Sequence, residues 1–161
     1  MPPPSLDDIE VAFERIKNRV RRTPCLRTRF IKDPLHAGPL MLKLECLQVT
    51  GSFKPRGANN AILQLDDAVL KRGVITASGG NHGIAVAYAA RASETRAVIY
   101  LPENAPVEKA DKLRAWGAEV IIDGRDFDDA NEIALTRADA DGLTYLHPFD
   151  NPHVVAGQGT V

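Results

Sequence analysis

The chain has 161 residues, of which 44% are hydrophobic, and this is enough apolar sequence to bury a substantial core. It carries 20 basic and 21 acidic residues, so its net charge of -1 creates no field that would attract nucleic acid, a membrane surface or a polyanion. No apolar run approaches the roughly 18 residues that a membrane-spanning helix needs. We therefore expect neither nucleic acid nor a membrane as a partner.

The first predicted element is a helix that runs from about Leu6 to about Val20. Ser5 is placed as its N-cap, and Asp7 and Asp8 suit the positive end of the helix dipole. Apolar residues recur at helical spacing at positions 6, 9, 13, 16 and 20. A short extended piece and a loop with proline and glycine follow over 27–39, then a strand over 39–45 and a helix from Pro55 to about Leu65.

From Gly73 onward, apolar strands alternate with segments of helix length. The strands are predicted over 73–77, 97–101, 118–123 and 143–147, and the helices over 82–92, 107–116 and 127–138. This alternation predicts an α/β fold with βαβ units on a parallel sheet. We place this compact unit at 67–154, with "DDAVLKRG" as its entry linker, and assign 1–66 and 155–161 to a second body.

The cysteines and histidines show no pattern that is typical of metal ligands. Cys25 and Cys46 lie among apolar residues, and no charged and apolar leader precedes the opening "MPPPSLDD". These features favour a reducing, cytoplasmic location. We expect no metal site, because no i, i+4 pair and no cysteine partner is found among His36, His82, His147 and His153.

Lys54 lies between a Gly-Ser-Phe turn and Pro55, a residue well suited to the first turn of a helix. Its ammonium would lie near the positive end of the helix dipole, with Arg56 two residues on, and both effects disfavour the charged form. Schiff-base chemistry requires a neutral amine, since only the free amine attacks a carbonyl. The alternative interpretation is a solvated lysine at a helix start.

The stretch "TASGGNHGIAVAYAA", residues 76–90, follows an apolar strand and opens an alanine-rich helix. Ser78, Gly79, Gly80 and Asn81 form a tight turn whose backbone N–H groups suit an anion, and Ser78, Asn81 and His82 add side-chain donors. The alternative is a simple turn with Asn81 as a cap. A dinucleotide site fits poorly, because Gly79 and Gly80 are adjacent where the motif needs G-x-G.

Together, these motifs resemble the fold-type II pyridoxal-phosphate enzymes, in the threonine dehydratase and serine racemase branch. The resemblance covers nearly the whole chain, in "RRTPCLRT", "LKLECLQVTGSFKPRGANNA", "SGGNHGIAVAYAA", "LPENAPVEKADKLRAWGAEVI" and "HPFDNPHVVAGQGT". It implies that 1–66 is the N-terminal part of a larger cofactor domain, 67–154 the small α/β domain and 155–161 a truncated return into the larger domain. It also implies a homodimer.

The resemblance assigns roles to six residues. Lys54 matches the lysine that binds pyridoxal 5'-phosphate through a Schiff base, Phe53 the residue against the pyridine ring, and Asn81 the partner of the ring hydroxyl. The loop that holds the substrate α-carboxylate is matched by Ser78, Gly79, Asn81 and His82. The phosphate cradle, the partner of the pyridine nitrogen and any cation site of the branch lie beyond Val161, so we expect the 161 residues to be roughly half of such an enzyme and inactive alone.

The implied activity is that of a dehydratase, an ammonia-lyase that converts L-threonine or L-serine to a 2-oxo acid and ammonia. Lys54 would remove the α-proton as general base. Racemases of the resembled family carry at the place of Gly79 a serine that acts as acid on the face opposite the lysine, so glycine favours elimination. A serine racemase-type activity and a non-catalytic fragment that binds a partner chain remain alternatives.

Overall fold

The structure is a computed structural model that describes residues 3–29 and 38–161. The helices, in chain order, are α1 (Leu6–Ile16), α2 (Lys54–Ile62), α3 (Asp67–Arg72), α4 (Asn81–Ala92), α5 (Val107–Ala115), α6 (Phe127–Asp141) and α7 (Pro152–Gln158). The strands are β1 (Cys25–Thr28), β2 (Leu40–Lys43), β3 (Val74–Ala77), β4 (Ala97–Leu101), β5 (Glu119–Ile122) and β6 (Thr144–Tyr145). A 3-10 turn, η1, spans Glu45–Leu47.

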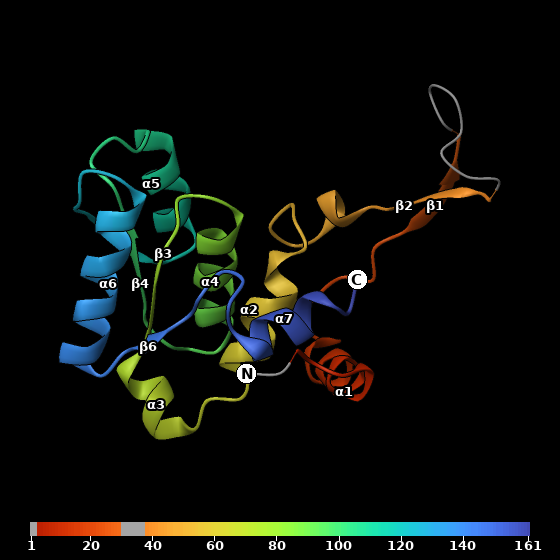
Figure 1. Ribbon diagram of the computed structural model, residues 1–161, viewed down its shortest axis with the longest axis horizontal. Helices are drawn as coiled ribbons and strands as arrows, with labels where there is room; N and C mark the ends of the chain where they lie inside the picture. Colours follow the sequence, from red (N-terminus) through yellow and green to blue (C-terminus); the bar gives the residue numbers. More distant parts are fainter. Residues whose placement is uncertain (1–2, 30–37) are drawn as a thin grey trace.

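A parallel sheet with the strand order β5-β4-β3-β6 confirms the predicted α/β architecture. Successive residues of its strands point to opposite faces. Ile75 and Val98 therefore belong to the core beneath α6, whereas Val74 and Ile99 belong to the core beneath α4 and α5. Figure 1 shows α6 on one side of β3 and β4, with α4 on the other. Burial on both faces explains why these strands are continuous apolar runs.

Helix α2 is buried almost throughout and connects the sheet unit to the rest of the chain. Ala58 and Ile62 of α2 lie in the same apolar cluster as α4, and Val154 of α7 joins them. The hydrophobic core therefore continues across the predicted boundary between 66 and 67. The division into domains at 66 and 154 stays a prediction.

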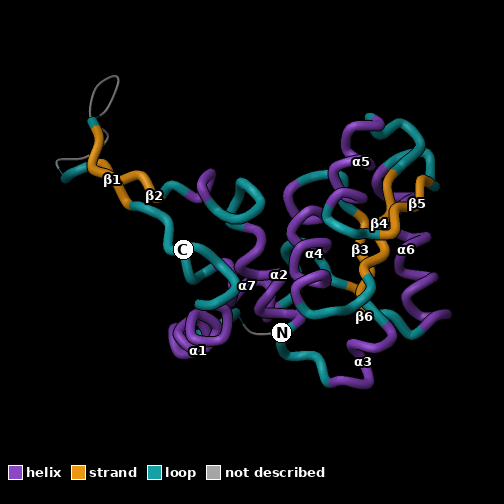
Figure 2. The backbone as a smooth tube through the Cα atoms, turned by 180° about the vertical axis from the view of Figure 1, so that it is seen from behind, coloured by secondary structure: helices purple, strands orange, loops and turns teal. Residues whose placement is uncertain are grey.

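The strands β1 and β2 form an antiparallel ribbon that projects from the body of the protein (Figures 1 and 2). Leu26 and Leu42 on this ribbon are 52% and 46% exposed. The predicted loop with proline and glycine, together with His36, lies largely outside the described residues.

Several predicted boundaries differ from the structure, among them the end of the helix predicted from Pro55 to about Leu65, which stops at Ile62. Helix α1 ends at Ile16, four residues before the predicted end. The expected linker at 67 forms α3 because the Asp66 side chain caps it by accepting a hydrogen bond from the Val69 N–H. Strand β6 has only two residues, which pair with β3, and α6 continues to Asp141, where Gly142 adopts a φ of 65°. No helix within 3–29 or 38–161 is long and apolar enough to cross a membrane.

Candidate functional site

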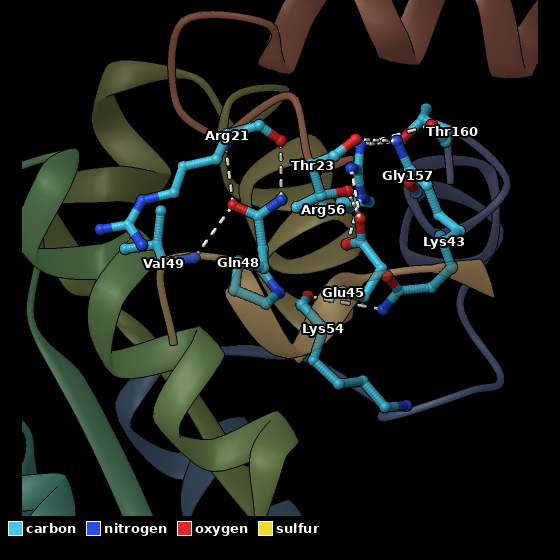
Figure 3. A network of polar contacts seen from close by, with 12 residues as sticks. Arg21, Thr23, Lys43, Glu45, Gln48, Val49, Lys54, Arg56, Gly157 and Thr160 are labelled. Atoms are coloured by element: carbon cyan, nitrogen blue, oxygen red, sulfur yellow. Dashed lines mark hydrogen bonds and ion pairs between the residues drawn. The ribbon is translucent and has the colours of Figure 1, made fainter. Parts of the chain in front are cut away.

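Lys54 is the first residue of α2, and Pro55 follows it in the first turn as predicted. The Lys54 ammonium donates a hydrogen bond to the Pro148 carbonyl at 2.8 Å and lies 5.4 Å from the centre of the Phe53 ring. Figure 3 shows that the Lys54 side chain extends away from a polar network on the other side of the α2 start. The amine therefore has one backbone acceptor and one aromatic neighbour.

Burial lowers the pKa of Lys54, in the direction that the sequence predicts. The cause of the lower pKa differs from the sequence prediction, which assigned it to the helix dipole and to the charge of Arg56. The Arg56 guanidinium is only 3% exposed and donates two hydrogen bonds of 2.8 Å to the carboxylate of Glu45, so its charge is balanced where it lies. Desolvation, rather than the charge of Arg56, is what disfavours the ammonium form of Lys54.

The turn before α4 leaves its backbone accessible. Gly80 is the N-cap, its N–H lies 3.3 Å from the Ser78 hydroxyl, and a Cβ added at Gly80 would meet nothing within 4 Å. Asn81 is exposed at the first position of α4. A Cβ added at Gly79, in contrast, would lie 2.9 Å from Leu101 Cδ2. The open space is therefore above Gly80 and Asn81, where the N–H groups of a helix start suit an anion.

The imidazole of His82 lies inside the protein, only 4% exposed, and not in the open turn. Its Nε2–H donates to the Leu146 carbonyl at 3.0 Å, and its Nδ1 is buried without a hydrogen-bond partner among the described residues. Burial is the largest cause that lowers the pKa of His82 to about 4, so the ring is neutral at physiological pH. Only the backbone of His82 is left to contact a ligand in the turn.

The segment 146–148 connects the two predicted motifs. The Leu146 carbonyl accepts hydrogen bonds from His82 and from the Thr76 hydroxyl, and the Pro148 carbonyl accepts one from Lys54. Lys54 and the start of α4 therefore meet at the carboxyl end of β3 and β6, where ligands bind in open parallel sheets. Motif analysis missed Thr76, Leu146 and Pro148. The sequence feature that could have pointed to Leu146 and Pro148 is that the segment 146–148 directly follows a strand.

A second network ties the start of α2 to distant segments (Figure 3). The Glu45 carboxylate accepts from Arg56 and, at 2.5 Å, from the Thr23 hydroxyl. Burial raises the pKa of Glu45, but the hydrogen bonds from Arg56 and Thr23 outweigh it, and the net pKa is lowered. Arg56 also donates to the Thr160 carbonyl and hydroxyl at 3.3 Å. Arg56, two residues after Lys54, is thus held to η1 and to the segment that follows α7.

Of the predicted site residues, the structure brings Lys54 and His82 to the segment 146–148 and Phe53 beside the Lys54 amine. It places Ser78, Gly79 and Asn81 in the turn next to His82. Which of them contact a cofactor or substrate stays a prediction. Within the described ranges, no three His, Cys, Asp or Glu residues gather closely enough to hold a metal ion.

Residues 16–161 match the family described as pyridoxal-phosphate dependent enzymes. The L-threonine ammonia-lyase of Thermotoga maritima is 45% identical over 157 residues, which are 98% of this chain and 39% of that protein. The L-threonine dehydratase catabolic TdcB of Staphylococcus aureus is 41% identical over 98% of this chain and 45% of its own length. The chain thus spans less than half the length of these curated relatives.

Solved structures show the same fold. Maize serine racemase superposes with a TM-score of 0.90 at 34% identity, over 99% of this chain and 48% of that one. The processed form of threonine deaminase isoform 2 from Solanum lycopersicum gives a TM-score of 0.86 at 36% identity, over 98% and 45%. These likenesses confirm the resemblance to the threonine dehydratase and serine racemase branch. Since the family match covers all but the first 15 residues, the chain belongs to the pyridoxal-phosphate dependent enzymes.

Proposed function

We propose that the protein is a pyridoxal-phosphate dependent lyase that converts L-threonine or L-serine to the corresponding 2-oxo acid and ammonia. The observation that carries this proposal is the environment of Lys54, a partly desolvated amine beside the Phe53 ring and the open turn at α4. The names of the relatives, L-threonine ammonia-lyase and L-threonine dehydratase, support the same substrate class.

The described residues fit the carbonyl and ring portions of pyridoxal 5'-phosphate. Lys54 would bind it covalently, the half-exposed Phe53 ring would lie against its pyridine ring, and Asn81 would donate to its ring hydroxyl. The fit rests on a lysine amine with one carbonyl partner and on the open space over Gly80. When bound, the cofactor supplies the electron sink for the charge left at the substrate Cα.

The residues of the chain would bind the substrate carboxylate and transfer the Cα proton. The turn formed by Ser78, Gly79, Asn81 and His82 would hold the substrate α-carboxylate and thereby orient the Cα–H bond. Once the substrate amine has replaced Lys54 on the cofactor, the released neutral amine of Lys54 would take the Cα proton, and the lowered pKa that burial provides favours this neutral form. The Pro148 carbonyl, 2.8 Å from Nζ, then accepts a hydrogen bond from the ammonium that results. Loss of the β-hydroxyl and addition of water complete the reaction, with the 2-oxo acid and ammonia as products.

Gly79 favours elimination over racemisation, because it has no side chain that could return a proton on the face opposite Lys54. General acid catalysis contributes about 10² to 10⁴ in rate, enough to decide between the two outcomes. A serine at this position requires Leu101 Cδ2 to shift and the flexible Lys109 side chain to give way slightly, because these atoms lie 2.9 Å and 3.1 Å from the added Cβ. The Gly79→Ser variant must therefore be shown to bind the cofactor before its products are compared.

The test measures the products that the full-length protein forms from L-threonine and L-serine. We expect 2-oxo acid and ammonia in equal amounts, little D-serine, and more D-serine from Gly79→Ser. Equal rates of racemisation and elimination in the unmodified protein would favour the racemase alternative. Absence of 2-oxo acid from both substrates would exclude the proposed lyase activity.

We extend the proposal to the assembly and location of the protein. The homodimer is supported by the family resemblance and by the exposed apolar side chains of Leu6 and Phe13 on α1, and a cytoplasmic location is supported by the free cysteines Cys25 and Cys46. Sedimentation of the full-length protein at several concentrations tests the dimer, because a monomer at all of them would contradict it.

A further inference from the structure

The first turn of α2 has no cap within its own sequence. The N-cap residue, Phe53, has no side-chain acceptor, and Pro55 has no N–H to satisfy. The Phe53 carbonyl accepts from the Arg56 N–H at 3.1 Å. Gly57 is buried, and a buried backbone N–H at a helix start is nearly always paired with an acceptor. The acceptor for the Gly57 N–H therefore comes from outside α2.

Gln158, the last residue of α7, supplies that acceptor. Its Oε1 accepts a hydrogen bond from the Gly57 N–H at 3.1 Å, and its Nε2 donates a long hydrogen bond of 3.5 Å to the Lys54 carbonyl. The two contacts enclose the turn that carries the Lys54 side chain. They come from a residue 104 positions later in the sequence than Lys54.

Two glycines bring Gln158 to this place. A Cβ added at Gly57 would lie 2.5 Å from Gln158 Nε2 and 2.6 Å from the Val154 carbonyl oxygen. A Cβ added at Gly157 would lie 2.6 Å from the Arg56 carbonyl oxygen and 2.7 Å from Gly57 Cα. Helices α2 and α7 therefore cross at a distance that only glycine allows at both positions. The hydrogen bonds from Arg56 to Thr160 hold the chain on the other side of Gln158.

We infer that Gln158 is a positioning residue for Lys54, because its side-chain amide fixes the turn from which the lysine extends. The inference rests on the proposed role of Lys54 as the cofactor-binding lysine. The Gln158 amide fixes the backbone end of the Lys54 side chain, and the Pro148 carbonyl holds its amine end. Fixing both ends matters because a shift of about 1 Å in a reacting group can lower a rate about 100-fold.

A matched set of variants separates positioning from packing. Gln158→Glu keeps the acceptor for Gly57, and its negative charge is favourable at the start of α2 but unfavourable at the end of α7, so the two dipole effects oppose each other. The same carboxylate cannot donate to the Lys54 carbonyl, and its charge favours the ammonium form of Lys54. Gln158→Met has a similar length and loses both contacts. Gln64→Glu is the control, since Gln64 is exposed just beyond the other end of α2 and donates to the Asn60 carbonyl.

The experiment measures the reactivity of Lys54 in the cofactor-free, full-length protein. Trace acetic anhydride labels free amines, and peptide mass spectrometry compares Lys54 with the exposed Lys71 over a series of pH values, while Tm is measured in parallel. In Gln158→Glu we expect Lys54 labelling at neutral pH to fall about tenfold relative to Lys71 and to recover at high pH, with Tm close to that of the wild type. Gln64→Glu should leave Lys54 labelling unchanged, and Gln158→Met should lower both labelling and Tm.

Unchanged Lys54 labelling in Gln158→Glu would overturn the inference. So would a fall in labelling that accompanies the same loss of Tm as in Gln158→Met, because Gln158 would then act through packing alone. If Gln158→Glu does not fold, Gln158→Met decides, since wild-type labelling of Lys54 in that variant would contradict positioning. The proposed function is judged separately, by whether pyridoxal phosphate attaches to Lys54 in the unmodified protein.

Discussion

The four-stranded sheet and the β1–β2 ribbon are held in place in different ways. Every residue of β3 and β4 is buried, and helices cover both faces of these strands. The ribbon exposes most of its residues, and two strands alone are marginally stable in water. The segment that follows the ribbon is held by polar contacts, above all the pair of Glu45 in η1 and the buried Arg56 in α2. The difference indicates that apolar burial stabilises the sheet unit, whereas a few long-range polar contacts hold the start of α2.

Removing the Glu45 carboxylate should have the largest effect on stability. In Glu45→Ala, the Arg56 guanidinium stays buried without its partner, and breaking such a pair costs about 3–5 kcal/mol of the free energy of unfolding. Denaturant unfolding measures the loss, and hydrogen exchange should show it in α2 before β4. Glu14→Ala is the control, because Glu14 pairs with Lys17 on the surface and should matter little. Similar losses in both variants would contradict a polar link at α2.

The second prediction contrasts an apolar residue in each region. Ile99 in β4 is fully buried, so Ile99→Ala should lower the free energy of unfolding by about 2–5 kcal/mol. Leu42 in β2 is 46% exposed, and Leu42→Ala should cost well under half of that. Denaturant midpoints of the two variants, measured side by side, provide the comparison. Equal losses would mean that the ribbon is packed as tightly as the sheet.

The third prediction concerns pH at the junction of the two motifs. The pKa of His82 is about 4 in the folded chain and about 6.5 in the unfolded chain, so the unfolded chain binds a proton more readily between these values. The stability that depends on neutral His82 is fully present above about pH 6.5. The free energy of unfolding falls by about 3 kcal/mol as the pH drops to about 4. Urea unfolding of the wild type and His82→Gln at several pH values measures it. A difference between the two that does not vary with pH would contradict a buried neutral His82.

The sheet was predictable from the sequence because each of its strands is a local apolar run followed by a segment of helix length. Helix α3 was not, since its six residues show no clear period and depend on the Asp66 cap. Lys54 and the turn before α4 were found from motifs of adjacent residues. Pro148 and Gln158 were missed for a physical reason. They act through a backbone carbonyl and a long-range side-chain contact, and neither leaves a local pattern in the sequence.

Covalent attachment of pyridoxal phosphate to Lys54 tests the central claim most directly. The full-length protein is incubated with the cofactor and reduced with borohydride, which makes the link permanent, and the modified peptide is then mapped. We predict modification of Lys54, none at Lys43 or Lys71, and none in Lys54→Arg, whose side chain cannot form the bond. Modification of Lys43 or Lys71 with Lys54 left unmodified would contradict the account.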